Sequence, residues 1–108
     1  MDQQVDLLVM GAGAAGMSAA LFAKLNGLNV LLCEKATKVG GTSATSGGTI
    51  WAPGSHLSVK AGVPDDIEQA RIFLKSVVGD RGGEELREAF LASSADMIRE
   101  LDEKTSVK

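Results

Sequence analysis

The fold of this chain is decided by Val5–Lys35, the stretch VDLLVMGAGAAGMSAALFAKLNGLNVLLCEK. Val5–Met10 is a short apolar run that leads into a glycine, as is typical of a parallel strand buried on both faces. Small and apolar residues follow over Ala14–Asn26 and end at an Asn-Gly pair, which predicts a helix. Asn29–Cys33 is a second run of the buried-strand type. Strand, helix and strand at this spacing predict a βαβ unit with a right-handed crossover and parallel strands.

The turn between the first strand and the helix carries the sequence GAGAAG over residues 11–16. Gly11 permits a tight turn, Gly13 lets a pyrophosphate reach the backbone without meeting a Cβ, and Gly16 lets the helix pack close to the strand. The free N–H groups and the dipole of the helix N-terminus favour an anion there. Glu34, at the end of the second strand, is placed to accept hydrogen bonds from ribose hydroxyls, and its charge disfavours a 2′-phosphate. The pattern predicts a dinucleotide site; the alternative is a glycine turn with Glu34 as a solvated strand end.

A second glycine-rich stretch, GGTSATSGG over residues 40–48, has no apolar periodicity, and we expect an irregular loop. Its backbone N–H groups and hydroxyls could line the remainder of a long cofactor, with a flexible surface loop as the alternative. Residues 49–51 are compatible with a short strand, and Ala52–Ser55 with a turn. The two glycine motifs alone do not distinguish FAD from NAD, because both cofactors present an ADP half.

Two amphipathic helices are expected to complete the chain. The first has Asp65 as its N-cap, with Glu68 three residues later. A glycine-rich break at residues 79–83 separates it from the second. The expected apolar stripes comprise Ile67, Ala70, Phe73, Leu74 and Val77 in the first helix and Leu86, Phe90, Met97 and Leu101 in the second.

Composition and charge exclude several classes of protein. The 108 residues are 44% hydrophobic, which argues against a disordered chain, and a single cysteine excludes a disulfide scaffold. The net charge of −3 gives no sign of a nucleic-acid or anionic-membrane partner. The uncharged run Leu7–Ala23 is interrupted by glycines and preceded by acidic residues, so we expect neither a transmembrane nor a signal segment. We therefore expect a cytoplasmic protein.

The predicted strands are too few for a complete nucleotide-binding fold. Both are expected to be fully buried, so they need sheet neighbours and helices on both faces. Folds of this kind normally contain more strands. We therefore expect the chain to be a fragment of a larger protein.

The chain resembles the N-terminal part of FAD-dependent oxidoreductases of the fumarate reductase/succinate dehydrogenase flavoprotein family, most specifically in Val5–Lys35 and in VGGTSATSGGTIWAP, residues 39–53. The second stretch is most similar to the 3-ketosteroid dehydrogenase branch. The resemblance covers essentially all of residues 1–108 and implies the N-terminal fragment of an FAD-binding domain. The implied fold is α/β: a partial Rossmann-like FAD-binding βαβ unit at 1–35, a Gly/Ser/Thr cofactor loop at 40–55 and a pair of amphipathic helices at 65–104.

The resemblance also implies which residues hold the cofactor. The glycine turn would bind the FAD diphosphate, Glu34 the adenosine ribose, and Lys35 would flank the adenosine. Some family members attach FAD through a histidine where this chain has Gly41 and Thr42, so the resemblance implies non-covalent FAD. The expected FAD-binding residues are Gly11, Ala12, Gly13, Ala14, Ala15, Gly16, Glu34, Lys35, Gly41, Thr42, Ser43, Ser46, Gly47 and Gly48, the last six along the stretch from pyrophosphate to flavin.

The implied parent enzyme transfers a hydride between the flavin and a carbon–carbon bond next to a carbonyl or carboxylate of a small-molecule substrate. We assign no catalytic residue: the ketosteroid branch uses tyrosines as acid and base and this chain contains none, and the fumarate branch uses arginine and histidine from later segments. We also assign no metal ligand, because no metal-ligand spacing is present. One alternative is a stand-alone NAD- or FAD-binding module without catalysis. Another is a truncated chain that binds no ligand and forms homo-oligomers through unpaired strand edges.

Three further residues are expected to be structural. Cys33 would be a buried thiol on its strand. His56 would be a surface residue in a polar loop, because no metal-ligand spacing surrounds it. Trp51 would pack against apolar side chains.

Overall fold

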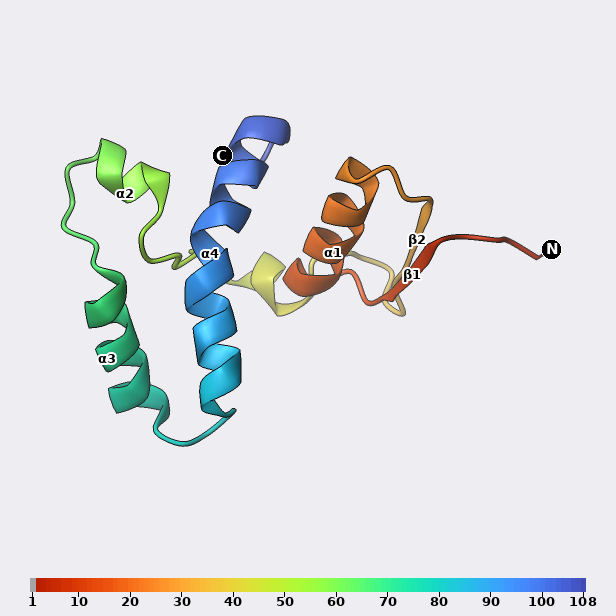
Figure 1. The fold of residues 1–108 in the computed structure, drawn as a ribbon. Coiled ribbons are helices and arrows are strands. Elements are labelled where there is room, and N and C mark those ends of the chain that lie inside the picture. Colours follow the sequence, from red (N-terminus) through yellow and green to blue (C-terminus); the bar gives the residue numbers. More distant parts are fainter. Residues whose placement is uncertain (1) are drawn as a thin grey trace. The chain divides into compact units, whose positions relative to one another are not determined.

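The computed structural model describes residues 2–108, which form two compact units, one ending at Thr49 and the other spanning Ile50–Lys108 (Figure 1). The first unit contains a parallel sheet and a helix, and the second is helical. The prediction of an α/β fold is confirmed. Within residues 2–108, no helix has both the length and the apolar character needed to cross a membrane.

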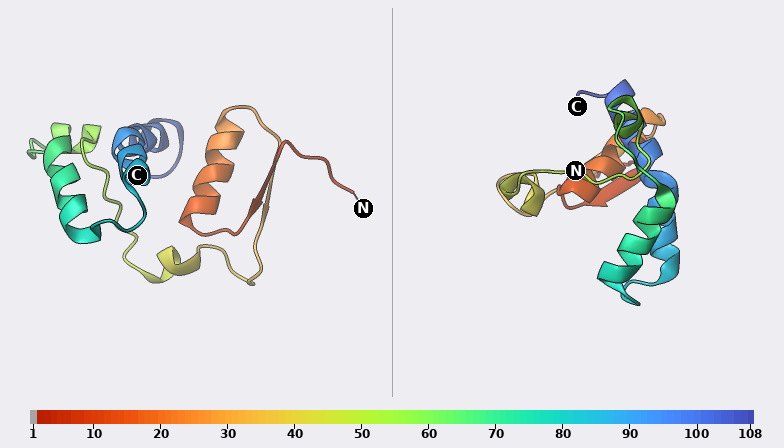
Figure 2. Two further views of the ribbon diagram at one scale, coloured as in Figure 1. Left: turned by 60° about the horizontal axis from the view of Figure 1, so that its bottom comes forward. Right: turned by 90° about the vertical axis from the view of Figure 1, so that its left-hand side faces the viewer.

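The first unit is the predicted βαβ unit. Strand β1 (Leu7–Met10) pairs in parallel with strand β2 (Val30–Cys33), in a register that places Met10 opposite Cys33. Helix α1 (Ala14–Leu25) connects the strands and packs on one face of the sheet (Figures 1 and 2). This arrangement brings the glycine turn and the end of β2 to the same edge of the sheet.

Both strands begin later than the apolar runs that predicted them. The N–H of Asp6 donates to the carbonyl oxygen of Asn29 at 2.9 Å, and the N–H of Asn29 donates to the Asp6 carboxylate at 2.8 Å. At this end of the strand pair, the Asp6 carboxylate thus takes the place of a backbone carbonyl as the acceptor for the Asn29 N–H. The helix between them ends as the Asn-Gly pair predicts, with Gly27 at a φ of 83° that favours glycine.

The sheet face opposite α1 is open within this unit, so the prediction of strands buried on both faces is wrong for the described residues. Leu8 is 53% exposed and Met10 is 74% exposed, and Cys33 is half-buried rather than buried. Val9 points the other way, towards α1, because side chains alternate along a strand. Within residues 2–49, a single helical layer covers the sheet.

The second glycine-rich stretch is more ordered than the predicted irregular loop. It contains a 3₁₀ helix, η1 (Gly41–Thr45), closed by side-chain hydrogen bonds to the backbone. The hydroxyl of Thr45 donates to the Thr42 carbonyl at 2.9 Å, and that of Ser46 donates to the Ser43 carbonyl at 3.1 Å. These short-range hydrogen bonds between hydroxyls and the backbone stabilise the 3₁₀ helix. Hydrophobic periodicity cannot predict them, because they do not involve apolar side chains. Residues 49–51 form no strand in the described chain, so that prediction is wrong.

The first helix of the second unit is short and is not predicted by hydrophobic periodicity. Helix α2 (His56–Lys60) follows Ser55, whose hydroxyl accepts the N–H of Ser58 at 3.3 Å and acts as an N-cap. His56 is therefore the first residue of a helix and not part of a polar loop, which corrects the prediction.

Helices α3 (Ile67–Val78) and α4 (Glu84–Lys104) form the predicted helical pair and run antiparallel, side by side (Figures 1 and 2). The N-cap of α3 is Asp66 rather than Asp65: its carboxylate accepts the N–H of Glu68 at 2.9 Å. The predicted break between the two helices is present at residues 79–83.

Arg71 joins α3 to α4 through a two-pronged ion pair. Its Nε and Nη2 donate to the two carboxylate oxygens of Glu88 at 2.7 and 3.1 Å, and it also pairs with Glu68. The hydrogen bond from Arg71 lowers the pKa of Glu88.

The expected apolar stripes are only partly buried. Phe73, Val77 and Leu86 are more than half exposed, whereas Leu91, outside the expected stripe, is 4% exposed. Trp51 contacts an apolar side chain as expected, with its ring edge-on to Phe73 and the centroids 5.6 Å apart, but it remains 46% exposed. The buried residues of α3 and α4 are Ala70, Leu91, Ser94 and Leu101.

Candidate cofactor site

The glycines of the first turn have separate geometric requirements. Gly11 adopts a φ of 104°, which favours glycine, and its N–H donates to the Cys33 carbonyl at 2.7 Å. A Cβ added at Gly16 would lie 1.8 Å from the Gly11 carbonyl oxygen, so a side chain there would collide with the turn itself. Gly13 differs, because a Cβ built there would meet no atom of the described chain within 4 Å. Two glycines thus shape the turn, and the third faces open space.

That open space lies at the N-terminus of α1. Gly13 is the N-cap, and among the described residues no side chain caps the helix and no acidic residue occupies its first turn. The first N–H groups of a helix have no intrahelical acceptor, and the helix dipole adds partial positive charge. Ala14 and Ala15 are exposed here. This end of α1 therefore suits a phosphate group that approaches the backbone closely.

The carboxylate of Glu34 is fixed beside the turn by two backbone donors. The N–H of Ala12 donates to its Oε2 at 2.8 Å, and the N–H of Ala36 donates to its Oε1 at 2.8 Å. The bond from Ala12, and next the bond from Ala36, lower the pKa of Glu34. The group is therefore ionised at neutral pH, and each oxygen keeps a lone pair for a further donor. A hydroxyl-bearing ligand would find a preorganised acceptor here.

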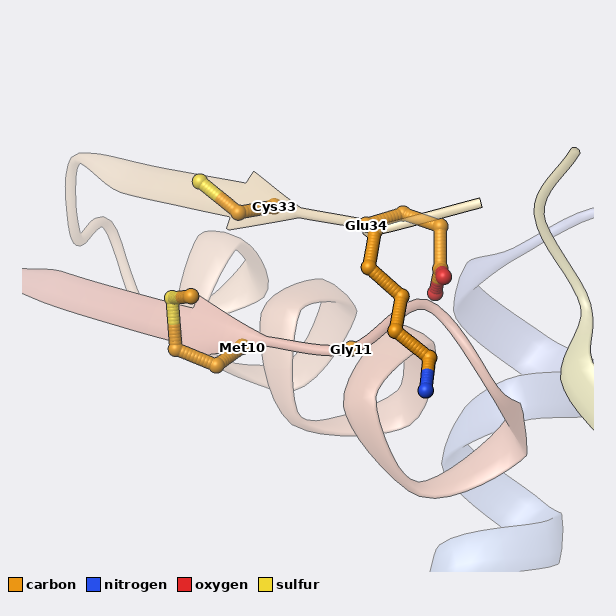
Figure 3. A pocket seen from close by; sticks show the side chains of 5 residues that line it. Met10, Gly11, Cys33 and Glu34 are labelled. Atoms are coloured by element: carbon orange, nitrogen blue, oxygen red, sulfur yellow. The ribbon is translucent and has the colours of Figure 1, made fainter. Parts of the chain in front are cut away.

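A groove of about 400 Å³ opens where β1 and β2 end. Figure 3 shows Met10 and Cys33 at the ends of the two strands, with Gly11 and Glu34 following them towards the turn. Ligands of parallel α/β sheets bind outside the carboxyl ends of the strands, where this groove lies. Its lining residues are Met10, Gly11, Cys33, Glu34 and Lys35.

The start of the second glycine stretch lies directly against the first turn. The N–H of Gly40 donates to the Ala12 carbonyl at 2.7 Å, and Gly40 forms a parallel β-bridge with Gly13. A Cβ added at Gly41 would lie 3.3 Å from the Cα of Gly13. Residues 40–41 therefore lie against the first turn, and the exposed residues 42–48 continue from there.

Gly40 is absent from the residue set predicted above. The sequence signal was present, since Gly40 opens the GGTSATSGG stretch, but the resemblance pointed to the second glycine of that pair. Its contact with Ala12 spans 28 residues of chain (40 − 12) and cannot be read from local pattern.

His56, in the second unit, has a partner that the sequence does not reveal. Its Nε2 lies 3.1 Å from Oδ2 of Asp102, near the end of α4. This hydrogen bond, followed by one from Lys108, lowers the pKa of Asp102. Within residues 2–108, no group of three or more His, Cys, Asp or Glu side chains could hold a metal ion.

Comparisons with known proteins agree with this geometry. The FAD binding domain family matches residues 6–107. The chain is 41% identical over 96 residues to a 3-oxosteroid 1-dehydrogenase of Mycobacterium tuberculosis, covering 89% of this chain and 17% of that protein. It is 34% identical over 105 residues to a 3-oxosteroid 1-dehydrogenase of Rhodococcus opacus, covering 97% of this chain and 20% of that protein.

A solved structure gives the same result for the fold. The 3-ketosteroid delta1-dehydrogenase from Sterolibacterium denitrificans, in complex with 1,4-androstadiene-3,17-dione, superposes with a TM-score of 0.81 at 36% identity, over 91% of this chain and 17% of that one. The chain spans about a fifth of the length of the curated relatives it matches. Because the family match extends over almost every residue, the chain belongs to the FAD binding domain family.

Proposed function

We propose that this chain holds FAD non-covalently as the N-terminal part of a flavin-dependent dehydrogenase or reductase. The observation that carries the proposal is the uncapped N-terminus of α1, open at Gly13, with the fixed carboxylate of Glu34 beside it. These groups fit a dinucleotide: backbone N–H donors meet a diphosphate, and an ionised acceptor meets ribose hydroxyls. When bound, FAD supplies a ring that accepts or donates a hydride.

The ADP half is assigned to the first turn and the end of β2. The N–H groups at the start of α1 bind the diphosphate, and Gly13 admits it to the backbone. Glu34 accepts from the adenosine ribose, and Lys35, which lines the groove, flanks the adenosine. The residues assigned here are Gly11, Ala12, Gly13, Ala14, Ala15, Gly16, Glu34 and Lys35.

The flavin half is assigned to the second glycine stretch. Ser46 also stabilises the loop itself, because its hydroxyl donates to the Ser43 carbonyl and accepts the N–H of Gly48, both at 3.1 Å. The exposed N–H groups and hydroxyls of η1 follow the cofactor away from the diphosphate. The residues assigned here are Gly41, Thr42, Ser43, Ser46, Gly47 and Gly48.

The non-covalent attachment and the reaction class are parts of the same proposal. The sole histidine, His56, starts α2 in the second unit, and Gly41 and Thr42 occupy the loop position where a histidine would attach FAD. The relatives named above support a substrate with a carbon–carbon bond next to a ketone. Acid, base and substrate-binding groups are assigned to sequence beyond this fifth of the parent enzyme.

Location and assembly complete the proposal. We place the protein in the cytoplasm, in keeping with the single cysteine of residues 1–108, which leaves no disulfide to form within this stretch. Self-association through the unpaired edges of the two-stranded sheet is proposed for the isolated chain, supported by the sheet order, in which each strand has only one hydrogen-bonded neighbour among the described residues. Cell fractionation and concentration-dependent size-exclusion chromatography test these two points.

A graded substitution series at Gly13 tests the assignment. A Cβ at this position meets no atom of the described chain, and its φ of −79° suits any residue, so Gly13→Ala and Gly13→Val should fold normally. The added methyl groups occupy the place of the diphosphate. We expect titration calorimetry to show weakened FAD binding for alanine and none for valine, with unchanged far-UV circular dichroism. Full FAD affinity in Gly13→Val would contradict the assignment.

A further inference from the structure

We propose that Gly40 is a positioning residue that couples the two cofactor loops, so that FAD, which spans both, binds through one rigid surface. The inference rests on the proposed function, and it assigns no ligand contact to Gly40 itself. The direct observations are the 2.7 Å hydrogen bond from the Gly40 N–H to the Ala12 carbonyl and the parallel β-bridge between Gly40 and Gly13. Gly40 is buried, whereas the loop that follows it is exposed.

Position 40 requires glycine for two independent reasons. Its φ of 114° lies in the region that L side chains rarely adopt. A Cβ there would also lie 2.5 Å from the Cβ of Ala44, on η1. An alanine at position 40 must therefore shift either its own backbone or η1, and both movements displace the second loop from the first turn.

The peptide groups of Ala12 make the coupling specific. Its N–H donates to the Glu34 carboxylate, and its carbonyl accepts from Gly40. Ala12 is fully buried between these two partners. Displacing Gly40 breaks the link to the flavin-side loop and leaves the link between the first turn and Glu34 in place. A ligand that uses the first turn alone should be insensitive to this change.

The test compares FAD with ADP, which has the same diphosphate and adenosine but no flavin half. Calorimetric titration of the 108-residue chain carrying Gly40→Ala should show FAD affinity reduced on the order of tenfold, the effect expected of a steric conflict of this size. ADP affinity should change by less than about twofold, since its contacts are intact. Gly27→Ala is the matched control: its φ is 83°, but nothing of the described chain lies within 4 Å of an added Cβ. It should leave the ratio of FAD to ADP affinity unchanged.

A second-site change separates the coupling from general damage. Ala44→Gly removes the atom that a Cβ at position 40 would strike, so the double variant Gly40→Ala/Ala44→Gly should recover part of the FAD affinity. The double variant also serves if Gly40→Ala alone does not fold. In the unliganded chain, amide hydrogen exchange followed by NMR should show the Gly40 N–H protected in the wild type and less so in Gly40→Ala.

The possible outcomes distinguish failure of the coupling role of Gly40 from failure of the proposed FAD-binding function. Equal losses of FAD and ADP affinity in Gly40→Ala, an FAD affinity matching that of Gly27→Ala, or a rapidly exchanging Gly40 amide in the wild type would overturn the coupling role alone. Failure of the unaltered folded chain to bind either ligand would overturn the proposed function and the coupling role together.

Discussion

At the scale of single residues, the GAGAAG turn shows that one glycine motif combines different physical requirements. Position 11 requires glycine because of its positive φ, and position 16 requires glycine because a Cβ there would collide with the Gly11 carbonyl. Neither reason applies to Gly13 within the described chain. A glycine that the protein's own atoms do not require is the one expected to serve a ligand.

Gly16→Ala should therefore damage the fold where Gly13→Ala does not. The alanine methyl at position 16 must push α1 away from the turn, and overpacking of this kind costs about 1–3 kcal/mol. Urea unfolding of the chain measures the loss, with Gly13→Ala as the control: its Cβ meets no atom of the described chain, so it should lose less stability than Gly16→Ala. Equal stabilities of the two variants would show that the close approach at Gly16 relaxes freely.

Glu34 should make the stability of the first unit depend on pH. Its pKa in the folded chain is lowered below the ordinary value of 4.5, so its contribution is fully present above that value and is lost as the pH falls through the folded pKa. In Glu34→Gln the amide group cannot accept from both Ala12 and Ala36, and stability at pH 7 should fall. The difference between wild type and Glu34→Gln in thermal midpoint should shrink between pH 5 and pH 3, a window about the ordinary pKa. A difference in thermal midpoint that stays constant across this range would show that ionisation of the Glu34 carboxylate does not contribute to stability.

At the scale of elements, hydrophobic periodicity identified α3 and α4 but did not give the buried line of α4. Periodicity correctly included Leu101, but it also favoured Leu86, which is 69% exposed, and it missed Leu91 and Ser94, which the helix buries. The orientation of α4 about its axis depends on what packs against it, including the interhelical ion pair of Arg71 with Glu88. The sequence pattern therefore predicts that α4 is a helix but does not predict its orientation about the helix axis.

Two alanine substitutions on α4 test that orientation. Leu91 is 4% exposed, and Leu91→Ala should lower the free energy of unfolding by about 2–5 kcal/mol, as truncation of a buried leucine does. Leu86 is 69% exposed, and Leu86→Ala should change it by less than about 0.5 kcal/mol. Chemical denaturation monitored by circular dichroism compares the two. A larger loss from Leu86→Ala than from Leu91→Ala would contradict the burial of Leu91 and the exposure of Leu86.

At the scale of the whole chain, the sequence predicted what is local and missed what is distant. The βαβ unit, the glycine turn and the helical pair follow from patterns within about thirty residues and are present in the structure. The bond from Gly40 to Ala12 and the pairing of His56 with Asp102 join residues 28 and 46 positions apart, and no local signal marks them. Helix α2 was not predicted, because it is too short to show hydrophobic periodicity and its main sequence signal is the Ser55 N-cap.

Retention of FAD by the 108-residue chain tests the central claim most directly. The purified chain is mixed with FAD and desalted, and the visible absorption spectrum of the protein fraction is recorded. The two glycine loops and Glu34 predict flavin absorption bands that elute with the protein in roughly equimolar amount and disappear with Gly13→Val. A folded protein fraction that carries no flavin would contradict the claim that these residues hold the cofactor.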